Sequence, residues 1–157
     1  MTKDIRSFKG EYRWLSNFHE VEVELDGVTY PTTEHAYQAA KTLNLDERQK
    51  ILQCKTPGQA KRAGMKVTLR PDWEEIKIGV MLDLTRQKFQ VMYLEGYLLE
   101  TEDAQLVEGN SWGDVFWGVD EATGEGQNNL GKILMLVREE AKERAAARQE
   151  FDDGGTT

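Results

Sequence analysis

Residues 20–30 read EVEVELDGVTY, in which acidic and apolar residues alternate as far as an Asp26-Gly27 pair. An alternation with period two is typical of a half-buried strand, and Asp-Gly is a favoured hairpin turn. Pro31 and two threonines follow at once, and they predict the start of a helix that covers roughly residues 33–44. The chain is therefore expected to fold as a β-hairpin that passes directly into a helix.

Capping residues and the spacing of apolar residues predict the remaining elements. Helices are expected from Asp46, over 57–64, from Trp73 after an Asp72 cap, and from Asn128 or Asn129, with helix or irregular chain over 93–100. The expected buried stripes are Trp73, Ile76, Val80 and Leu84 in the long central helix, and Leu130, Ile133, Leu134 and Val137 in the last one. The glycine-rich segment 109–127 is expected to form loops.

These elements predict an α+β fold that is predominantly α-helical, with a small N-terminal β-hairpin. A chain of 157 residues is about the size of one ordinary domain, and no internal repeat or low-complexity linker divides it. We therefore expect a single domain over residues 1–145. Residues 146–157 are expected to be a frayed tail because the apolar spacing is lost there.

The formal net charge of −8 argues against a protein that coats nucleic acid in general. The segment 50–88 departs from this balance, because it holds nine basic and only four acidic residues. Such a segment is either a solvated helical face or a local landing site for phosphate on an acidic protein. Charge alone favours the solvated face.

The sequence predicts a water-soluble, cytoplasmic protein. No stretch approaches the roughly 20 apolar residues of a membrane span, and residues 1–14 lack the apolar core of a secretion signal. The single Cys54 excludes an internal disulfide, and its thiol is expected to be structural or incidental. With only two histidines and one cysteine, no zinc site is expected, and no cofactor is predicted.

The first predicted helix sorts its side chains onto two sides. Ala36, Ala39, Ala40 and Leu43 fall on one side, whereas Glu34, Tyr37, Gln38 and Lys41 fall on the other. The second group is either an exposed polar face or a candidate site. Glu34 lies in the first turn, where the positive helix end favours the carboxylate form, and the Lys41 backbone lies about 10 Å further along the axis. Long side chains at these two positions can reach one small substrate.

Residues 111–118 read SWGDVFWG, with a glycine beside each of two tryptophans and an aspartate between them. Taken alone, a tryptophan-rich loop is more often part of a core than a binding surface. The glycines Gly113 and Gly118, however, allow unusual backbone dihedral angles and close approach of a ligand. Asp114 adds a carboxylate to this loop.

Five motifs in this order resemble the NADAR family, whose name stands for NAD- and ADP-ribose-associated and which is also called YbiA-like. They are WLSNF (14–18), YPTTEHAYQAAK (30–41), GMKVTLRPDWEEIKIGVM (64–81), LVEGNSWGDVFWG (106–118) and GQNNLGKILMLVR (126–138). The resemblance extends from about Phe8 to Arg138, and five ordered motifs are far more specific than any one of them.

The resemblance implies a compact, mainly helical domain with N-glycosidase activity, which is hydrolysis of the bond between a phosphorylated ribose and an amine or base. Members of the family act on early riboflavin-pathway intermediates or remove ADP-ribose from guanine bases. The implied partners are a ribose-phosphate or ADP-ribosyl small molecule, or ADP-ribosylated nucleic acid. The family motifs correspond here to Asn17, Glu34, His35, Gln38, Lys41, Trp73, Asp114, Trp117, Gly118 and Asn129.

Two positions depart from the family pattern. Thr42 stands where the family usually has an aromatic residue, and Met65 and Lys66 stand where an arginine often follows the glycine. The second change bears on the phosphate contact, for which Lys66 and Arg70 are the nearest basic residues to the motif. Asn17 is expected to fix a ribose hydroxyl.

Cleavage of an N-glycosidic bond passes through a cation-like sugar carbon, which a carboxylate stabilises while a second group positions water. Glu34 and Asp114 are the expected pair, with roles that can be exchanged. Lys41 offers a second route, in which its amine attacks the ring-opened ribose and forms a Schiff base. Trp73 or Trp117 would stack on the flat leaving group.

This interpretation expects the polar strip of the first helix and the SWGDVFWG loop to line one pocket. Two other hypotheses also fit the sequence. One is a reader that binds ADP-ribose or NAD without reaction, and the other is a helical adaptor whose tryptophan loop meets a protein partner.

Overall fold

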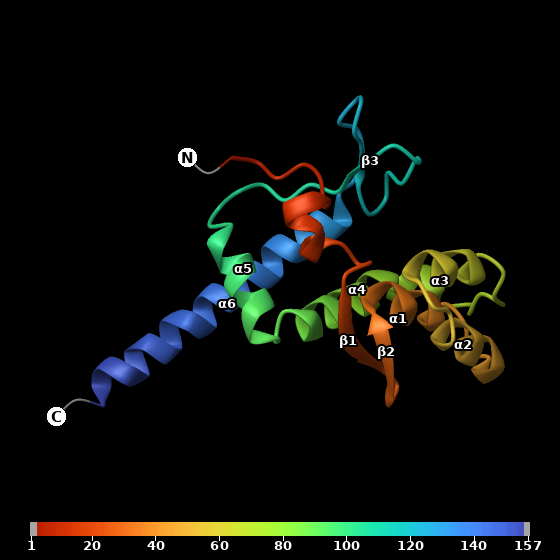
Figure 1. The fold of residues 1–157 in the computed structure, drawn as a ribbon, viewed down its shortest axis with the longest axis horizontal. Coiled ribbons are helices and arrows are strands. Elements are labelled where there is room, and N and C mark those ends of the chain that lie inside the picture. The colour runs from red at the N-terminus through yellow and green to blue at the C-terminus, as the bar shows by residue number, and fades with distance from the viewer. Residues whose placement is uncertain (1–2, 156–157) are drawn as a thin grey trace. The chain divides into compact units, whose positions relative to one another are not determined.

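The computed structural model describes residues 3–155. Their contacts group into two compact units. The hairpin unit spans Phe8–Lys88, and the terminal unit combines the described residues of Met1–Ser7 with those of Phe89–Thr157. Figure 1 labels helices and strands of both units, with the chain coloured from red at the N-terminal end to blue at the C-terminal end. The expectation of a single domain over 1–145 stays a prediction.

The hairpin unit begins with the 3-10 helix η1 (Gly10–Leu15) and the strands β1 (Glu20–Leu25) and β2 (Val28–Thr32). The strands pair antiparallel, with Leu25 opposite Val28 across the turn. Asp26 and Gly27 both have positive φ, 49° and 83°. Two positive φ values are what a type I′ turn requires, and this turn matches the right-handed twist of the strands. The predicted hairpin is confirmed.

Four helices complete this unit: α1 (Thr33–Ala40), α2 (Leu45–Leu52), α3 (Pro57–Gly64) and α4 (Trp73–Lys88). Side-chain caps set the starts of the first three, because Thr32, Asn44 and Thr56 each accept a hydrogen bond from the backbone N–H three residues later. Pro57 at the first position and Gly64 at the end bound α3 as predicted. The predicted Asp46 cap of α2 is wrong, since Asn44 takes that place.

Helix α1 is shorter than expected, because it ends at Ala40 and not near residue 44. Thr42 lies just beyond this end and is fully buried. Its hydroxyl donates a hydrogen bond to Glu47 and accepts one from the N–H of Asn44. This threonine, which replaces the family's usual aromatic residue, therefore organises the turn from α1 into α2.

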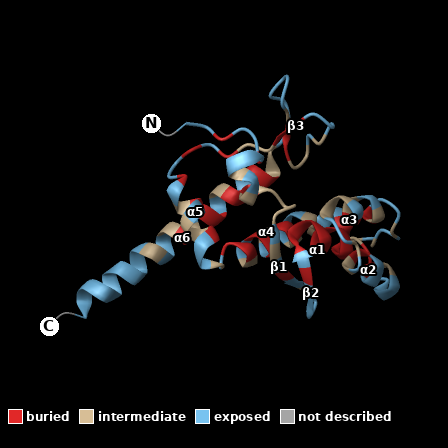
Figure 2. Ribbon diagram, viewed as in Figure 1, coloured by how far each residue is buried: buried red, intermediate tan, exposed pale blue. Residues whose placement is uncertain are grey.

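All eight residues of α1 are buried, from Thr33 to Ala40 (Figure 2). The helix contacts both strands of the hairpin as well as α2, α3 and α4. The interpretation of its polar side as an exposed face is therefore wrong. The grouping of Leu43 with the three alanines on one side of the helix is wrong, because Leu43 follows the helix end and is 60% exposed, whereas the alanines are buried.

The predicted stripe of α4 is correct only at its two ends. Trp73 and Leu84 are buried, but Ile76 and Val80 are only partly buried. The other buried residues of α4 are Met81, Thr85 and Lys88. The buried side therefore runs from Trp73 in steps of four residues to Met81 and Thr85, and the step between Trp73 and Met81 falls on Lys77. A search for apolar residues alone misplaces this side because long lysine stems also pack against a core.

The terminal unit contains α5 (Met92–Glu100), two short parallel strands, β3 (Gly109–Asn110) and β4 (Val119–Asp120), and α6 (Asn129–Gly154). Ile5 forms an isolated parallel β-bridge with Leu106. Arg138 of α6 is buried and donates hydrogen bonds to Thr101 and to the carbonyl of Ala104. These bonds fix the segment after α5 to α6.

The predicted buried stripe of α6 is confirmed at Leu130, Ile133, Leu134 and Val137. The helix then continues to Gly154, through most of the segment expected to fray, while residues 156–157 lie outside the described part of the chain. Arg144 and Arg148 both form ion pairs with Glu95 of α5, and alanines at 145–147 have the highest helix propensity. These two features account for the longer helix.

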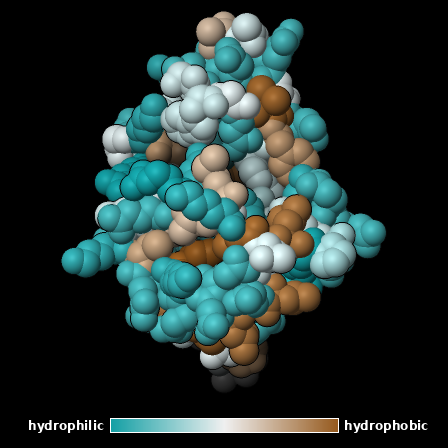
Figure 3. All heavy atoms as spheres, turned by 90° about the vertical axis from the view of Figure 1, so that its right-hand side faces the viewer, coloured by the Kyte–Doolittle hydropathy of each residue, from teal (hydrophilic) through white to brown (hydrophobic). Residues whose placement is uncertain are grey.

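The predominantly α-helical α+β class with a small hairpin is confirmed. Within residues 3–155, no helix has both the length and the apolar character that a membrane span needs. Hydrophilic side chains cover much of the face drawn in Figure 3, and hydrophobic ones are interspersed among them. In the hairpin unit the exposed large apolar side chains include those of Leu45 and Met65.

Candidate functional site

Glu34 lies in the first turn of α1 and is only 7% exposed. Its N–H donates to the carbonyl of Asn17, which holds the WLSNF segment against this turn. Its Oε1 accepts a hydrogen bond of 2.7 Å from the side-chain amide of Gln38. The carboxylate is thus buried, close to the positive end of a helix dipole and oriented by an amide one turn later.

Gln38 reaches Glu34 because α3 leaves room for its side chain at Gly64. A Cβ atom built on Gly64 would overlap Gln38 Oε1 and come within 2.6 Å of its Cδ. Gln38 is almost fully buried, and its Oε1 has no hydrogen-bond partner. Its amide nitrogen is therefore committed to Glu34, while its Oε1 lies against the α3 backbone at Gly64 without a hydrogen bond. This arrangement makes Gln38 an orienting group for Glu34, and its predicted contact with the substrate stays a prediction.

We expect Gly64→Ala to lower the free energy of unfolding by about 1–3 kcal/mol, because overpacking forces Gln38 or α3 to move. Gly58→Ala is a matched control in the same helix, since a Cβ there meets only ordinary contacts of 3.8 Å or more. Urea unfolding followed by circular dichroism measures both. Equal stability of the two variants would contradict the close packing of Gln38 on Gly64.

Three side chains from α1 and α4 stack in a row. The rings of Tyr37 and Trp73 lie 5.2 Å apart between centroids and are tilted by 56°, and both residues are buried. Lys41 Nζ also lies over the Tyr37 ring, 5.5 Å from its centroid. A cation this close to an aromatic face is attracted by the ring quadrupole. Trp73 thus packs on Tyr37, and Tyr37 supports the Lys41 amine.

The surroundings of Lys41 lower the pKa of its amine. Burial is the largest cause, because it disfavours the charged form, and the charges of Lys61 and Lys77 act in the same direction. Glu34 acts against them and raises the pKa. A lysine with a lowered pKa has a larger fraction of the nucleophilic, uncharged amine near neutral pH.

His35 is fully engaged within the protein. Its Nε2 lies 2.9 Å from the carbonyl of Cys54, and its Nδ1 lies 2.7 Å from the hydroxyl of Thr32. A carbonyl only accepts, so Nε2 carries the proton and Nδ1 accepts from Thr32. The histidine is 1% exposed and fastens α1 to the end of α2. It therefore has a role in the fold, and its predicted substrate contact stays a prediction.

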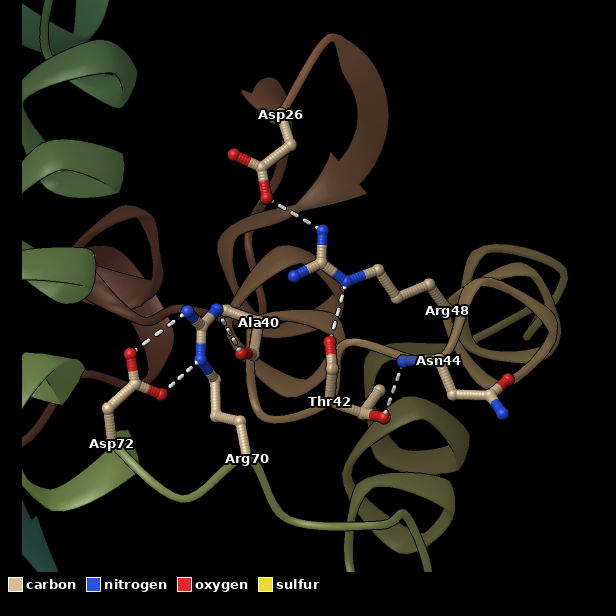
Figure 4. Close-up of polar contacts among 7 residues, drawn as sticks. All are labelled: Asp26, Ala40, Thr42, Asn44, Arg48, Arg70 and Asp72. Atoms are coloured by element: carbon tan, nitrogen blue, oxygen red, sulfur yellow. Dashed lines mark hydrogen bonds and ion pairs between the residues drawn. The ribbon is translucent and has the colours of Figure 1, made fainter.

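Two arginines hold the C-terminal end of α1 (Figure 4). Arg70 binds both carboxylate oxygens of Asp72 and also donates to the carbonyl of Ala40. Arg48 donates to the carbonyl of Thr42 and pairs with Asp26 of the hairpin turn. The Arg70 guanidinium is thus paired with a carboxylate and has a role in the fold, and its predicted phosphate contact stays a prediction.

Lys66, the other predicted phosphate contact, follows α3 and is exposed. Sequence reasoning missed Lys77, which lies between Trp73 and Met81 on the buried side of α4 and has a side chain only 16% exposed. The signal that could have found it is the spacing of four residues from Trp73 to Lys77 and from Lys77 to Met81. Met81 in turn accepts a weak hydrogen bond, 3.6 Å, from the side chain of Asn17.

In the terminal unit, Asn110 organises the SWGDVFWG loop. It is 1% exposed, donates to the carbonyls of Asp114 and Val119, and accepts from the N–H of Asp114. Asp114 Oδ1 accepts from the N–H groups of Phe116 and Trp117. One oxygen of the predicted catalytic carboxylate is therefore committed to the turn. Asn110 was not predicted, although it begins this turn in the sequence.

The other predicted residues of this unit also take part in the local fold. A Cβ on Gly118 would overlap the carbonyl of Glu108, so the glycine is required by strand packing. Trp117 is partly buried and stacks edge-on with Phe116 at 4.8 Å, while Trp112 is exposed. The Asn129 side chain donates to Gln127. The prediction that this loop and the α1 strip line one pocket stays a prediction.

Among residues 3–155, no group of three or more histidine, cysteine or acidic side chains is placed to hold a metal ion. The arrangement in the hairpin unit is instead one of organic acid and amine groups. It combines a buried, oriented carboxylate with an amine of lowered pKa on one side of a single helix. Such a pair suits a reaction at a carbon that becomes positively charged or forms an imine.

A model of the NADAR domain matches residues 6–142 of the chain. The N-glycosidase YbiA of Escherichia coli K12 is 39% identical over 137 residues, which cover 85% of this chain and 84% of that protein. The NMR structure of E. coli YbiA superposes with a TM-score of 0.80 at 36% sequence identity, covering 93% of this chain and 89% of that chain.

A riboflavin biosynthesis protein of Vibrio vulnificus is 39% identical over 135 residues, covering 84% of this chain. The chain spans only 36% of that relative's length. An N-glycosidase of Nostoc punctiforme is 36% identical over 137 residues and is covered over 86% of its own length. The family model, the relatives and the shared fold agree along most of the sequence, so the chain belongs to the NADAR domain family.

Proposed function

We propose that this protein is an N-glycosidase, a hydrolase that cleaves the bond between ribose and nitrogen in a phosphorylated nucleoside-like substrate. The observation that carries the proposal is that α1 places a buried carboxylate, Glu34, and a lysine of lowered pKa, Lys41, on the same side. Two relatives that align with most of this chain carry the name N-glycosidase, and the alignments cover 84% and 86% of their own length.

Glu34 has the role of charge stabiliser in this reaction. As the bond to nitrogen lengthens, positive charge develops on the ribose C1 carbon and its ring oxygen. A carboxylate that is already buried and oriented by Gln38 stabilises that charge without reorganising. The bonding electrons stay with the nitrogen, which takes up a proton and leaves as the amine or base, and water bonds to C1 and loses a proton to give the free sugar.

Lys41 provides the covalent route. Its uncharged amine adds to C1 of the ring-opened, protonated ribosylamine, and the bond from C1 to the leaving nitrogen then breaks as that nitrogen takes up a proton. The product is an imine between Lys41 and the sugar. Water adds to this imine and releases the free sugar aldehyde together with the lysine amine. The lowered pKa of Lys41 supports this role.

Two classes of substrate fit this reaction, because both contain a phosphorylated ribose joined to nitrogen. The name of the Vibrio relative refers to riboflavin biosynthesis, and this name favours a ribosylamino-pyrimidine phosphate. The family's other substrate class is ADP-ribose attached to guanine. Asp114 as the group that orients water or a ribose hydroxyl, and Trp117 as a stacking surface, are further parts of this proposal.

Incubation of the purified protein with each substrate, followed by chromatography of the released amine or base, tests the activity. We expect release of the pyrimidine amine from the ribosylamino-pyrimidine phosphate at a rate well above the spontaneous one. Folded protein that turns over neither substrate would contradict the proposal. Tight calorimetric binding of ADP-ribose without any turnover would instead identify a non-catalytic reader.

A further inference from the structure

The position of Lys77 on α4 places its stem beside the Glu34 end of α1. Trp73, four residues earlier, stacks on Tyr37 of α1. Met81, four residues later, contacts the Asn17 side chain, and the Asn17 carbonyl binds the N–H of Glu34. Residues four apart on a helix lie on one side, so Lys77 lies between these two anchor points.

Helix α3 brings a second lysine to the same place. Gly64 contacts the Gln38 side chain, and Lys61 lies three residues before it, on nearly the same side of α3. The charges of Lys61 and Lys77 both act on the amine of Lys41. Lys61 of α3 and Lys77 of α4 therefore both lie within electrostatic reach of Lys41, which caps the C-terminal end of α1.

The local balance of charge is positive. Glu34 is the acidic group that acts on Lys41 from within the strip, whereas Lys61 and Lys77 oppose it. Lys77 also pairs with Glu74 at 2.6 Å, but the side chain of Glu74 is 75% exposed. An exposed ion pair of this kind contributes little stability, so a doubly charged anion can replace the Glu74 carboxylate at Lys77. A phosphoryl group offers that charge and several acceptor oxygens.

We propose that Lys61 and Lys77 form the subsite for the phosphoryl group on ribose C5, while Glu34 and Lys41 act at C1. The inference rests on the proposed function for the identity of the sugar. It replaces Lys66 and Arg70 as phosphate contacts, because the first is exposed and the second is paired with Asp72. The same phosphoryl chemistry is present in a ribose 5-phosphate ester and in the diphosphate of ADP-ribose.

Isothermal titration calorimetry with ribose 5-phosphate, with ribose and with ADP-ribose tests the subsite directly. We expect Lys61→Met and Lys77→Met each to weaken ribose 5-phosphate binding by about tenfold, since each removes one charge-assisted contact. Binding of unphosphorylated ribose should not change between the variants and the wild type. Equal loss for ADP-ribose would mean that the subsite takes the diphosphate too, and loss for ribose 5-phosphate alone would restrict it to the monoester.

Arg62→Met is the matched control, because it removes one positive charge from an exposed position next to Lys61 on α3. It should bind ribose 5-phosphate like the wild type, and a similar loss in this variant would overturn the subsite in favour of a general charge effect. Unchanged binding in both lysine variants would overturn it as well. Circular dichroism establishes that each variant is folded, and Lys61→Met carries the same test if Lys77→Met does not fold.

The outcomes separate the subsite from the proposed function because binding does not depend on turnover. Ribose 5-phosphate binding that is lost in Lys77→Met, in a protein without glycosidase activity, would retain the subsite and reject the function. Glycosidase activity whose KM is the same in the wild type and in both lysine variants would retain the function and reject the subsite.

Discussion

Lys41→Met is expected to lower kcat/KM for N-glycosidic cleavage at least about 100-fold, the scale typical of an acid–base or nucleophilic group. Methionine keeps much of the stem that packs near Tyr37 but has no amine to form an imine. Borohydride added during turnover should trap the sugar on the wild-type protein and leave Lys41→Met unlabelled. Mass spectrometry detects this difference, and a labelled variant would place the imine on another lysine.

The pH dependence of the reaction gives an independent readout of Lys41. Its pKa is lowered, first by burial, so kcat should rise with pH as the ammonium loses its proton and should level off below the usual lysine range. A rate that is independent of pH up to that range, with full activity in Lys41→Met, would indicate direct attack by water.

Glu34→Gln is expected to lower kcat at least about 100-fold with little change in stability. The new amide has nearly the same shape and its oxygen can still accept from Gln38, so the loss reports the missing charge. Glu75→Gln, at an exposed position of α4, is the control and should keep full activity. A Glu34→Gln variant as active as this control would remove Glu34 from the mechanism.

The same substitution should also act on Lys41. Glu34 raises the pKa of the lysine, so its removal lowers that pKa further. Any residual activity of Glu34→Gln should therefore rise at a lower pH than wild-type activity does. A shift in the opposite direction would mean that the two groups do not interact as the structure indicates.

The local elements of the hairpin unit were largely predictable from the sequence. Asp26-Gly27 and the Thr56-Pro57 cap carry their own geometry, so their turn and helix start follow from residue type. The burial of α1 was not predictable in the same way. Polar side chains at these positions are compatible with exposure to solvent. Their burial becomes evident only from the strands and helices that pack around α1.

The candidate site likewise combines features that the sequence predicts with features that depend on the tertiary structure. The carboxylate and amine of α1 were predicted by their spacing, and the structure adds Gln38 as the group that orients Glu34. Lys77 was missed because it occupies a core-facing position that sequence rules reserve for apolar residues. For His35 and Arg70 the structure adds contacts within the fold, and neither a motif nor local charge tells such contacts from contacts with a ligand.

The covering of α1 on every side has a consequence for how such a protein diversifies. A helix with no solvent-facing position leaves almost no substitution without a cost, so a saturation mutagenesis library should recover few tolerated changes across its eight residues. New leaving-group preferences would then have to arise from the surrounding elements and loops, which retain exposed positions. Glu34, inside the covered helix, would then change rarely, while the residues around the site vary.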